Sequence, residues 1–159
     1  MIRRKAVSKT ISNFVRYIPN SRPTTKLTKH TLKVKQRPAT AESADSEAIV
    51  SAIIESIAAK KGESIISLDL RNLEEAVTDF FVVCHATSTT QVKAIADQII
   101  RSLKDTGYIK PWHSEGWENL EWVLIDYVNV VAHVFLKGRR DYYGLEELWS
   151  DGILQEHDD

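Results

Sequence analysis

The spacing of apolar residues predicts a first helix from about residue 45 to residue 62. Apolar side chains recur there at intervals of three and four residues, which places them on one face of a helix. Asp45 or Ser46 can cap the start of this helix, and Gly62 can close its end. The apolar positions are Ile49, Val50, Ile53, Ile54 and Ile57.

A second helix is predicted from Ser88, where Ser88 and Gln91 form a Ser-x-x-Gln capping box, with Gly107 just beyond its end. Its apolar face consists of Val92, Ile95, Ala96, Ile99 and Leu103. A short third helix is predicted after Gly138 and a basic, aromatic turn. The apolar residues of this last helix are Leu145, Leu148 and Trp149.

Short β-branched and apolar segments between these helices predict strands. They are residues 64–70, 79–84, 108–113, 121–126 and 129–136. The third is weak because Pro111 cannot donate to a strand ladder, and the last two form a hairpin through 127–129. The predicted order is αββαβββα, an α/β (α+β) fold in which helices pack on a mixed sheet of about five strands.

Charge divides the chain into a basic arm and an acidic domain. Residues 1–41 contain eleven Lys and Arg and no Asp or Glu, whereas the remainder holds ten basic and 22 acidic residues, a net charge of −12. We interpret 1–44 as a mostly disordered arm, 45–151 as the domain and 152–159 as an acidic tail. Within the arm, a short amphipathic basic helix ending at Pro19 is predicted from Val7, Ile11, Phe14, Val15 and Ile18.

The strand that turns into a helix at residues 86–89 is similar to the nucleotidyltransferase architecture, which needs two carboxylates at alternate strand positions to bind magnesium. The following strands contain no such pair, because Glu121 and Asp126 are five residues apart and point to opposite faces. The turn also lacks glycine for a close approach to phosphate. We therefore predict no nucleotidyl transfer, although a nucleotide-handling enzyme stays the alternative from another functional class.

Other candidate chemistry has a structural interpretation. Cys84 is the single cysteine and suits a small core residue in a reducing compartment, and the five histidines lack zinc-ligand spacing, so no cofactor or metal is expected. His133, within an apolar strand, is expected to be buried and hydrogen-bonded. Asp126 is either a turn acceptor or part of a partner-facing patch. No stretch is long and apolar enough to span a membrane.

Aromatic residues gather in the last third of the domain, which is typical of an interface. They are Trp112, Trp117, Trp122, Trp149, Tyr127, Tyr142 and Tyr143. Trp117, in a polar loop, has the weakest claim to a core position. These absences and this clustering predict a domain that docks onto a partner and does not catalyse a reaction.

Several ordered motifs together closely resemble the ribosomal silencing factor (Iojap-like) family over about residues 45–151. They are 85–97 (HATSTTQVKAIAD), 115–116 (EG), 121–127 (EWVLIDY), 133–135 (HVF) and 141–149 (DYYGLEELW). The resemblance implies a homodimer that binds the large ribosomal subunit at ribosomal protein L-fourteen and blocks joining of the small subunit when nutrients are scarce. It also implies a nucleotidyltransferase-like fold without the catalytic carboxylates.

Carried onto this sequence, the family's partner-facing positions correspond to Trp122, Asp126 and Tyr127, with Glu115 and Gly116 nearby. A net charge of −12 over residues 42–159 would attract a basic ribosomal protein. The basic arm is a tether to rRNA, a mitochondrial presequence or a dispensable tail, so the expected location is the cytoplasm with the mitochondrial matrix as the alternative. A structural dimer with a role in ribosome assembly is a further alternative.

Overall fold

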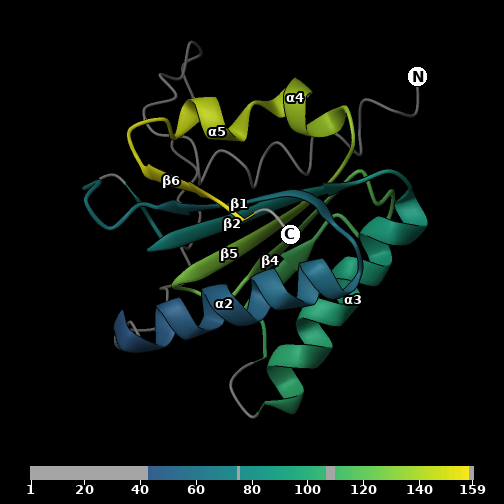
Figure 1. Ribbon diagram of the computed structural model, residues 1–159, viewed down its shortest axis with the longest axis horizontal. Coiled ribbons are helices and arrows are strands. Elements are labelled where there is room, and N and C mark those ends of the chain that lie inside the picture. The colour runs from purple at the N-terminus through teal and green to yellow at the C-terminus, as the bar shows by residue number, and fades with distance from the viewer. Residues whose placement is uncertain (1–42, 75, 107–109, 158–159) are drawn as a thin grey trace, which may run out of the picture.

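The computed structural model describes residues 43–74, 76–106 and 110–157. The basic helix predicted near the N-terminus lies outside the described residues. Six strands form one mixed sheet in the order β3-β4-β5-β2-β1-β6, with α2 and α3 on one face and α4 and α5 on the other (Figure 1). The strands are β1 (Glu63–Asp69), β2 (Phe80–Ala86), β3 (His113–Glu115), β4 (Trp122–Asp126), β5 (Val130–Leu136) and β6 (Ile153–Glu156). The predicted mixed α/β fold is confirmed.

The central pair, β2 and β5, is the parallel one, and the other neighbouring strands are antiparallel. The crossover between β2 and β5 contains α3 (Thr89–Asp105), β3 and β4. The carboxyl ends of β2 and β5 therefore meet at one edge, where α3 begins. In this arrangement both central strands are buried on their two faces, which explains their continuous apolar sequence.

Helix α2 (Ser43–Ala59) begins earlier than predicted, so Asp45 and Ser46 are helical residues and do not occupy the N-cap position. Ser46 is buried instead, and its hydroxyl donates to Asp79 at 3.2 Å. At the other end, Lys61 adopts a left-handed conformation with φ 57°. The backbone N–H groups of Lys61 and Gly62 donate to carbonyls of the last helical turn, a Schellman arrangement in which Lys61 takes the position that glycine favours.

The capping box at α3 is half confirmed. The Gln91 N–H donates to the Ser88 hydroxyl at 3.2 Å, as predicted. The Gln91 side chain does not return to the Ser88 N–H; its oxygen accepts from the N–H and the hydroxyl of Thr87. Its amide nitrogen donates to the carbonyls of Lys60 and Lys61, so Gln91 ties the end of α2 to the start of α3.

Three other segments differ from the prediction. The weak strand expected at 108–113 is shifted to β3, so only His113 is shared. The predicted C-terminal helix is divided at Gly144, which is left-handed, into α4 (Arg139–Tyr143) and α5 (Leu145–Leu148). The segment interpreted as an acidic tail contains β6, which pairs with β1 and makes a sixth strand. The hairpin of β4 and β5 is confirmed.

Two apolar layers lie on the two faces of the sheet. The larger one is packed between the sheet and helices α2 and α3, and includes the predicted faces of both helices. The smaller one lies beneath α4 and α5 and is rich in aromatic residues. No helix within the described ranges is long and apolar enough to cross a membrane.

Candidate functional site

The five predicted partner-binding residues lie along the β3–β4 edge, by which we mean residues 113–116 and 122–127. Strand β3 pairs with β4 so that Glu115 is opposite Leu124 and His113 is opposite Asp126. The edge is thus one continuous piece of structure. Its side chains, however, are divided between the two faces of the sheet, because successive residues of a strand point in opposite directions.

Trp122 points into the aromatic layer beneath α4 and is 3% exposed. Its ring stacks on Phe135 with a centroid distance of 4.9 Å and lies 4.8 Å from the ring of Tyr143. The indole N–H donates to Nδ1 of His133 at 3.2 Å. Trp122 therefore supports the surface above it and does not itself present a large exposed area.

Asp126 and Tyr127 shape the turn into β5. Asp126 is 2% exposed, and its carboxylate accepts the Val128 N–H at 2.7 Å, so the turn-acceptor interpretation is confirmed. The Asn129 N–H donates to the Tyr127 carbonyl at 3.0 Å, which makes a γ-turn with Val128 at φ 77°. Tyr127 packs on the opposite face from Trp122, in the layer beneath the long helices. Burial raises the pKa of the Tyr127 phenol.

Glu115 and Gly116 are both partly exposed at the end of β3. Glu115 forms an ion pair with His113. Gly116 has φ +88°, and a Cβ atom there would lie 1.8 Å from the carbonyl oxygen of Trp122. Gly116 is thus required by the close approach of two backbones, which is a structural reason for its place in the motif.

The exposed aromatic group of this region is on α4. Tyr142 is 73% exposed, and its ring packs edge-on against Tyr143 at 5.2 Å. Tyr143 in turn covers Trp122, and Arg139, also on α4, donates to Glu121 at 3.0 Å. The sequence indicated an aromatic cluster but could not show which member projects outward. Tyr142 does so because α4 turns Arg140 and Tyr143 toward the sheet and leaves Asp141 and Tyr142 on its outer side.

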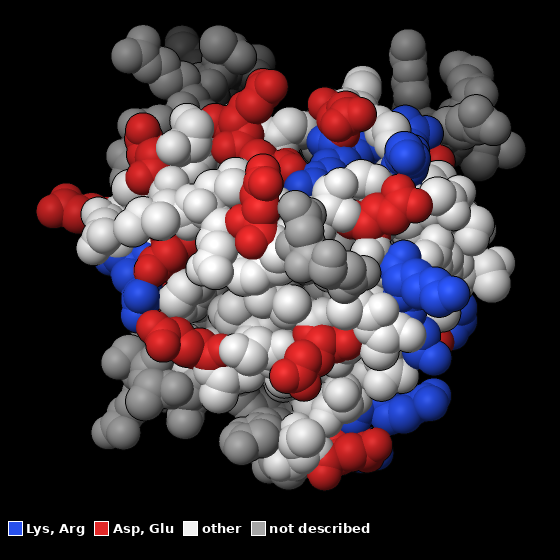
Figure 2. Space-filling model, in the orientation of Figure 1, with Lys and Arg blue, Asp and Glu red and all other residues white. Residues whose placement is uncertain are grey.

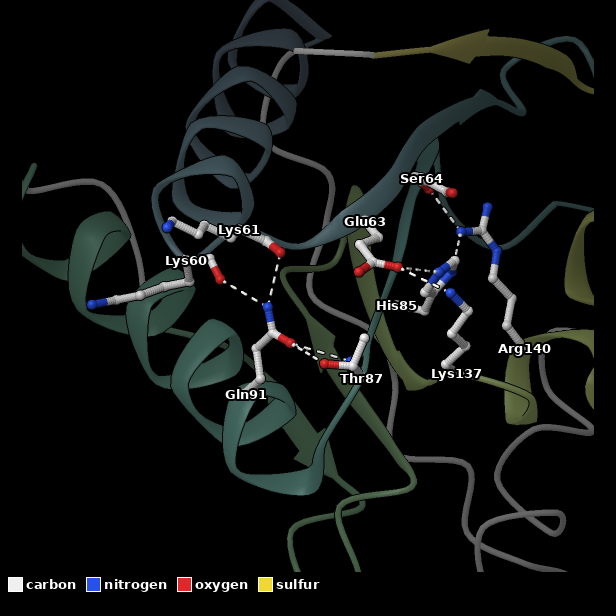
Figure 3. A network of polar contacts seen from close by, with 9 residues as sticks. All are labelled: Lys60, Lys61, Glu63, Ser64, His85, Thr87, Gln91, Lys137 and Arg140. Carbon is white, nitrogen blue, oxygen red and sulfur yellow. Dashed lines mark hydrogen bonds and ion pairs between the residues drawn. The ribbon is translucent and has the colours of Figure 1, made fainter.

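A second polar cluster lies at the carboxyl ends of β2 and β5 (Figure 3). The Arg140 guanidinium donates to the Ser64 carbonyl at 2.7 Å, to Glu146 at 2.5 Å and to Nδ1 of His85 at 3.3 Å. Because arginine only donates, this contact makes His85 Nδ1 an acceptor and leaves Nε2–H to donate to Glu63 at 3.2 Å. Lys137 contacts the same carboxylate and, with His85, lowers the pKa of Glu63.

These contacts give the cluster a structural role, because they connect separate elements of the fold. Arg140 is 9% exposed and connects α4 and α5 to β1 and β2. Among the described residues, no group of three or more His, Cys, Asp or Glu side chains could hold a metal ion. Cys84 is fully buried, as predicted, and burial raises the pKa of its thiol to about 12. His133 is also buried and hydrogen-bonded, as predicted, and desolvation lowers its pKa to about 3.

Comparison with solved structures gives the class of the fold. The chain superimposes on the crystal structure of protein CV0518 from Chromobacterium violaceum with a TM-score of 0.62 and 39% identity, covering 65% of this chain and 85% of that one. The protein is therefore an α/β domain of the same architecture as CV0518.

The sequence comparisons then give the family. Residues 43–159 match the family described as "Ribosomal silencing factor during starvation". The ribosomal silencing factor of Bacillus subtilis is 41% identical over 99 residues, which is 62% of this chain and 82% of that protein. That of Halalkalibacterium halodurans is 42% identical over 92 residues, or 58% of this chain and 77% of that protein. The chain belongs to the ribosomal silencing factor family, as its resemblance indicated, and its role is a ribosome-associated, regulatory one.

Proposed function

We propose that this protein binds the large ribosomal subunit at ribosomal protein L-fourteen and sterically blocks joining of the small subunit when nutrients are limiting. The observation that carries the proposal is an exposed aromatic residue, Tyr142, on the helix α4 that packs over Trp122, in a part of the chain, residues 42–159, whose net charge is −12. Acidic side chains steer a surface toward a basic ribosomal protein, and an exposed aromatic ring buries a large area with few rotors.

The contact surface would consist of the β3–β4 edge together with α4. Tyr142 would touch the partner directly because it is 73% exposed, and Glu115, whose side chain is 18% exposed, would contact the partner at the border of this surface. Trp122, Asp126 and Tyr127 would act from beneath, through their packing and through the turn that Asp126 closes. Gly116 would keep β3 against β4. This assignment uses all five predicted partner-binding residues, of which Glu115 would make contact and the other four would support the surface.

The test is cosedimentation of the purified full chain with large subunits, together with a light-scattering assay of subunit joining. Glu115→Lys and Tyr142→Ala should each weaken binding about tenfold, equivalent to about 1.4 kcal/mol. Glu55→Lys provides the matched control because it makes the same charge change at an exposed position of α2. Thermal melting of each variant would show that the fold is intact.

Two outcomes contradict the proposal. One is a wild-type protein that fails to comigrate with large subunits at low salt or leaves subunit joining unchanged. The other is an equal loss of binding in Glu55→Lys and Glu115→Lys, which would mean that total charge and not this surface matters. Magnesium-dependent nucleotide turnover would instead favour the alternative enzyme.

We further propose a homodimer, acting in the cytoplasm, with the basic arm as an additional tether to rRNA. The arm carries eleven positive charges, which would add several salt-sensitive phosphate contacts. Deleting residues 1–41 should weaken subunit binding and reduce its salt dependence while leaving the melting temperature unchanged. Lost mitochondrial import with normal binding would support the presequence instead. Sedimentation equilibrium would test the dimer.

A further inference from the structure

The turn between α2 and β1 carries two lysines that no part of the proposed surface uses. Lys60 and Lys61 are both exposed. Within the described part of the chain neither ammonium group has an ion-pair partner, in contrast to Lys137, which lies 3.4 Å from Glu63. Figure 3 shows the two side chains extending in the same direction, away from Gln91 and from the His85 cluster.

The turn is held in place by hydrogen bonds to its backbone, so its side chains are left free to contact a partner. Gln91 donates to the carbonyls of Lys60 and Lys61 at 3.2 and 2.8 Å, and its oxygen accepts from Thr87. Gly62 must be glycine, since a Cβ there would lie 2.3 Å from Cγ2 of Ile57. The backbone is therefore fixed whatever side chains residues 60 and 61 carry.

Lys61 is an unfavourable residue for the conformation that it adopts. At φ 57° glycine or asparagine would be accommodated more easily than lysine. A residue that is strained in the folded state and makes no ion pair there points to a use for its side chain outside the fold. The neighbouring Lys60 doubles the positive charge at the same point.

The surroundings favour a phosphate partner. Figure 2 shows basic side chains mainly on one side of the molecule, where α4 lies and where α2 ends and α3 begins, while acidic side chains are spread over the face. The first turn of α3, which begins beside this lysine turn, contains no acidic residue. Lysine is a flexible point charge suited to phosphate oxygens, and it would be repelled by the basic ribosomal protein proposed for the other surface.

We propose that Lys60 and Lys61 contact phosphates of the large-subunit rRNA while the β3–β4 edge and α4 contact protein. This inference rests on the proposed function, because it assumes that the protein is bound to the large subunit. The lysine turn would lie beside the protein-contacting surface, since Arg140 of α4 donates to the Ser64 carbonyl at the same end of the sheet. An acidic domain with one basic corner would then be oriented, as well as attracted, on a surface made of rRNA and basic proteins.

The experiment compares the full-length wild type with a Lys60→Gln, Lys61→Asn double variant by cosedimentation with purified large subunits from 50 to 300 mM salt. The variant should bind more weakly, and the slope of log affinity against log salt should fall by about one to two. Its melting temperature should be equal or higher, because asparagine accepts the left-handed conformation better than lysine. Lower stability would contradict the strain argument.

The matched control is Arg101→Gln, Lys104→Gln, which removes two exposed positive charges elsewhere, on α3. An equal fall of the salt slope in both double variants would overturn the proposal, because it would reflect overall charge.

A photo-crosslinking residue placed at position 60 should join to rRNA, and crosslinks to protein alone would overturn the proposal too. If the wild type binds subunits and the Lys60, Lys61 variant has an unchanged slope, this inference fails and the proposed function stands; if the wild type does not bind, both fail.

Discussion

Substitution of Gly116 by alanine tests the close approach of β3 and β4 that positions the whole candidate surface. Gly116 has φ +88°, a conformation that costs an L-residue about 1–2 kcal/mol. The added Cβ would also lie 1.8 Å from the Trp122 carbonyl oxygen, 2.8 Å from its carbonyl carbon and 3.1 Å from Cα of Val123. All three are backbone atoms, so no side-chain rotation can relieve the clash.

The strand edge must therefore move, and overpacking of this kind costs about 1–3 kcal/mol in addition. We expect Gly116→Ala to lower the free energy of unfolding by about 3 kcal/mol or more. Gly138→Ala is the matched control because Gly138 has a nearly identical φ of +86° and no atom within 4 Å of its virtual Cβ. It should lose only the conformational part, about 1–2 kcal/mol.

Urea unfolding followed by tryptophan fluorescence would measure both variants, and thermal melting should separate them by several degrees. Equal losses in Gly116→Ala and Gly138→Ala would refute the close approach. The result also affects how binding data are interpreted. If Gly116→Ala loses subunit binding in proportion to its instability, the glycine of the Glu-Gly motif acts through the position of β3 and not through contact.

The other predictions concern buried and bridging groups. The pKa of His133 is about 3 in the folded state against an ordinary 6.5, so the unfolded chain takes up the proton first as the pH falls. The free energy of unfolding should therefore be highest above pH 6.5 and lower by about 2 kcal/mol at pH 5. His133→Asn should lose this pH dependence in urea titrations. Arg140→Ala leaves the Glu146 carboxylate and the Ser64 carbonyl without this donor, so the free energy of unfolding should fall by about 2–3 kcal/mol. Amide hydrogen exchange should become faster in α4 and α5, and faster exchange in other elements alone would contradict the bridging role. Gln91→Ala removes the bonds between the two helix ends and should cost about 1–2 kcal/mol in thermal melts. Gln91→Glu keeps the acceptor for Thr87 but places a carboxylate oxygen against the carbonyls of Lys60 and Lys61, so it should cost at least as much. Cys84 should react with thiol reagents only as fast as the chain unfolds, since it is fully buried; rapid labelling under native conditions would show that β2 is accessible.

The regular elements were predictable wherever one local signal decided them. The periodic apolar face and the Ser88 cap specify α3, and the continuous apolar runs specify the hairpin of β4 and β5. The first turn of α2 was misplaced because two polar residues that resemble a cap lie inside the helix. Ser46 is satisfied there by Asp79, a partner 33 residues away that no local pattern reveals.

The sequence by itself determined the charge division, the missing carboxylate pair and the family, because each depends only on which residues are present and in what order. The tertiary structure decided which aromatic residues are accessible. Trp122 and Tyr142 belong to two of the family's motifs and to the same aromatic cluster, yet one is 3% and the other 73% exposed. That difference arises from the packing of α4 on the sheet. It also made β6 a strand, because its exposed sequence gains stability only by pairing with β1.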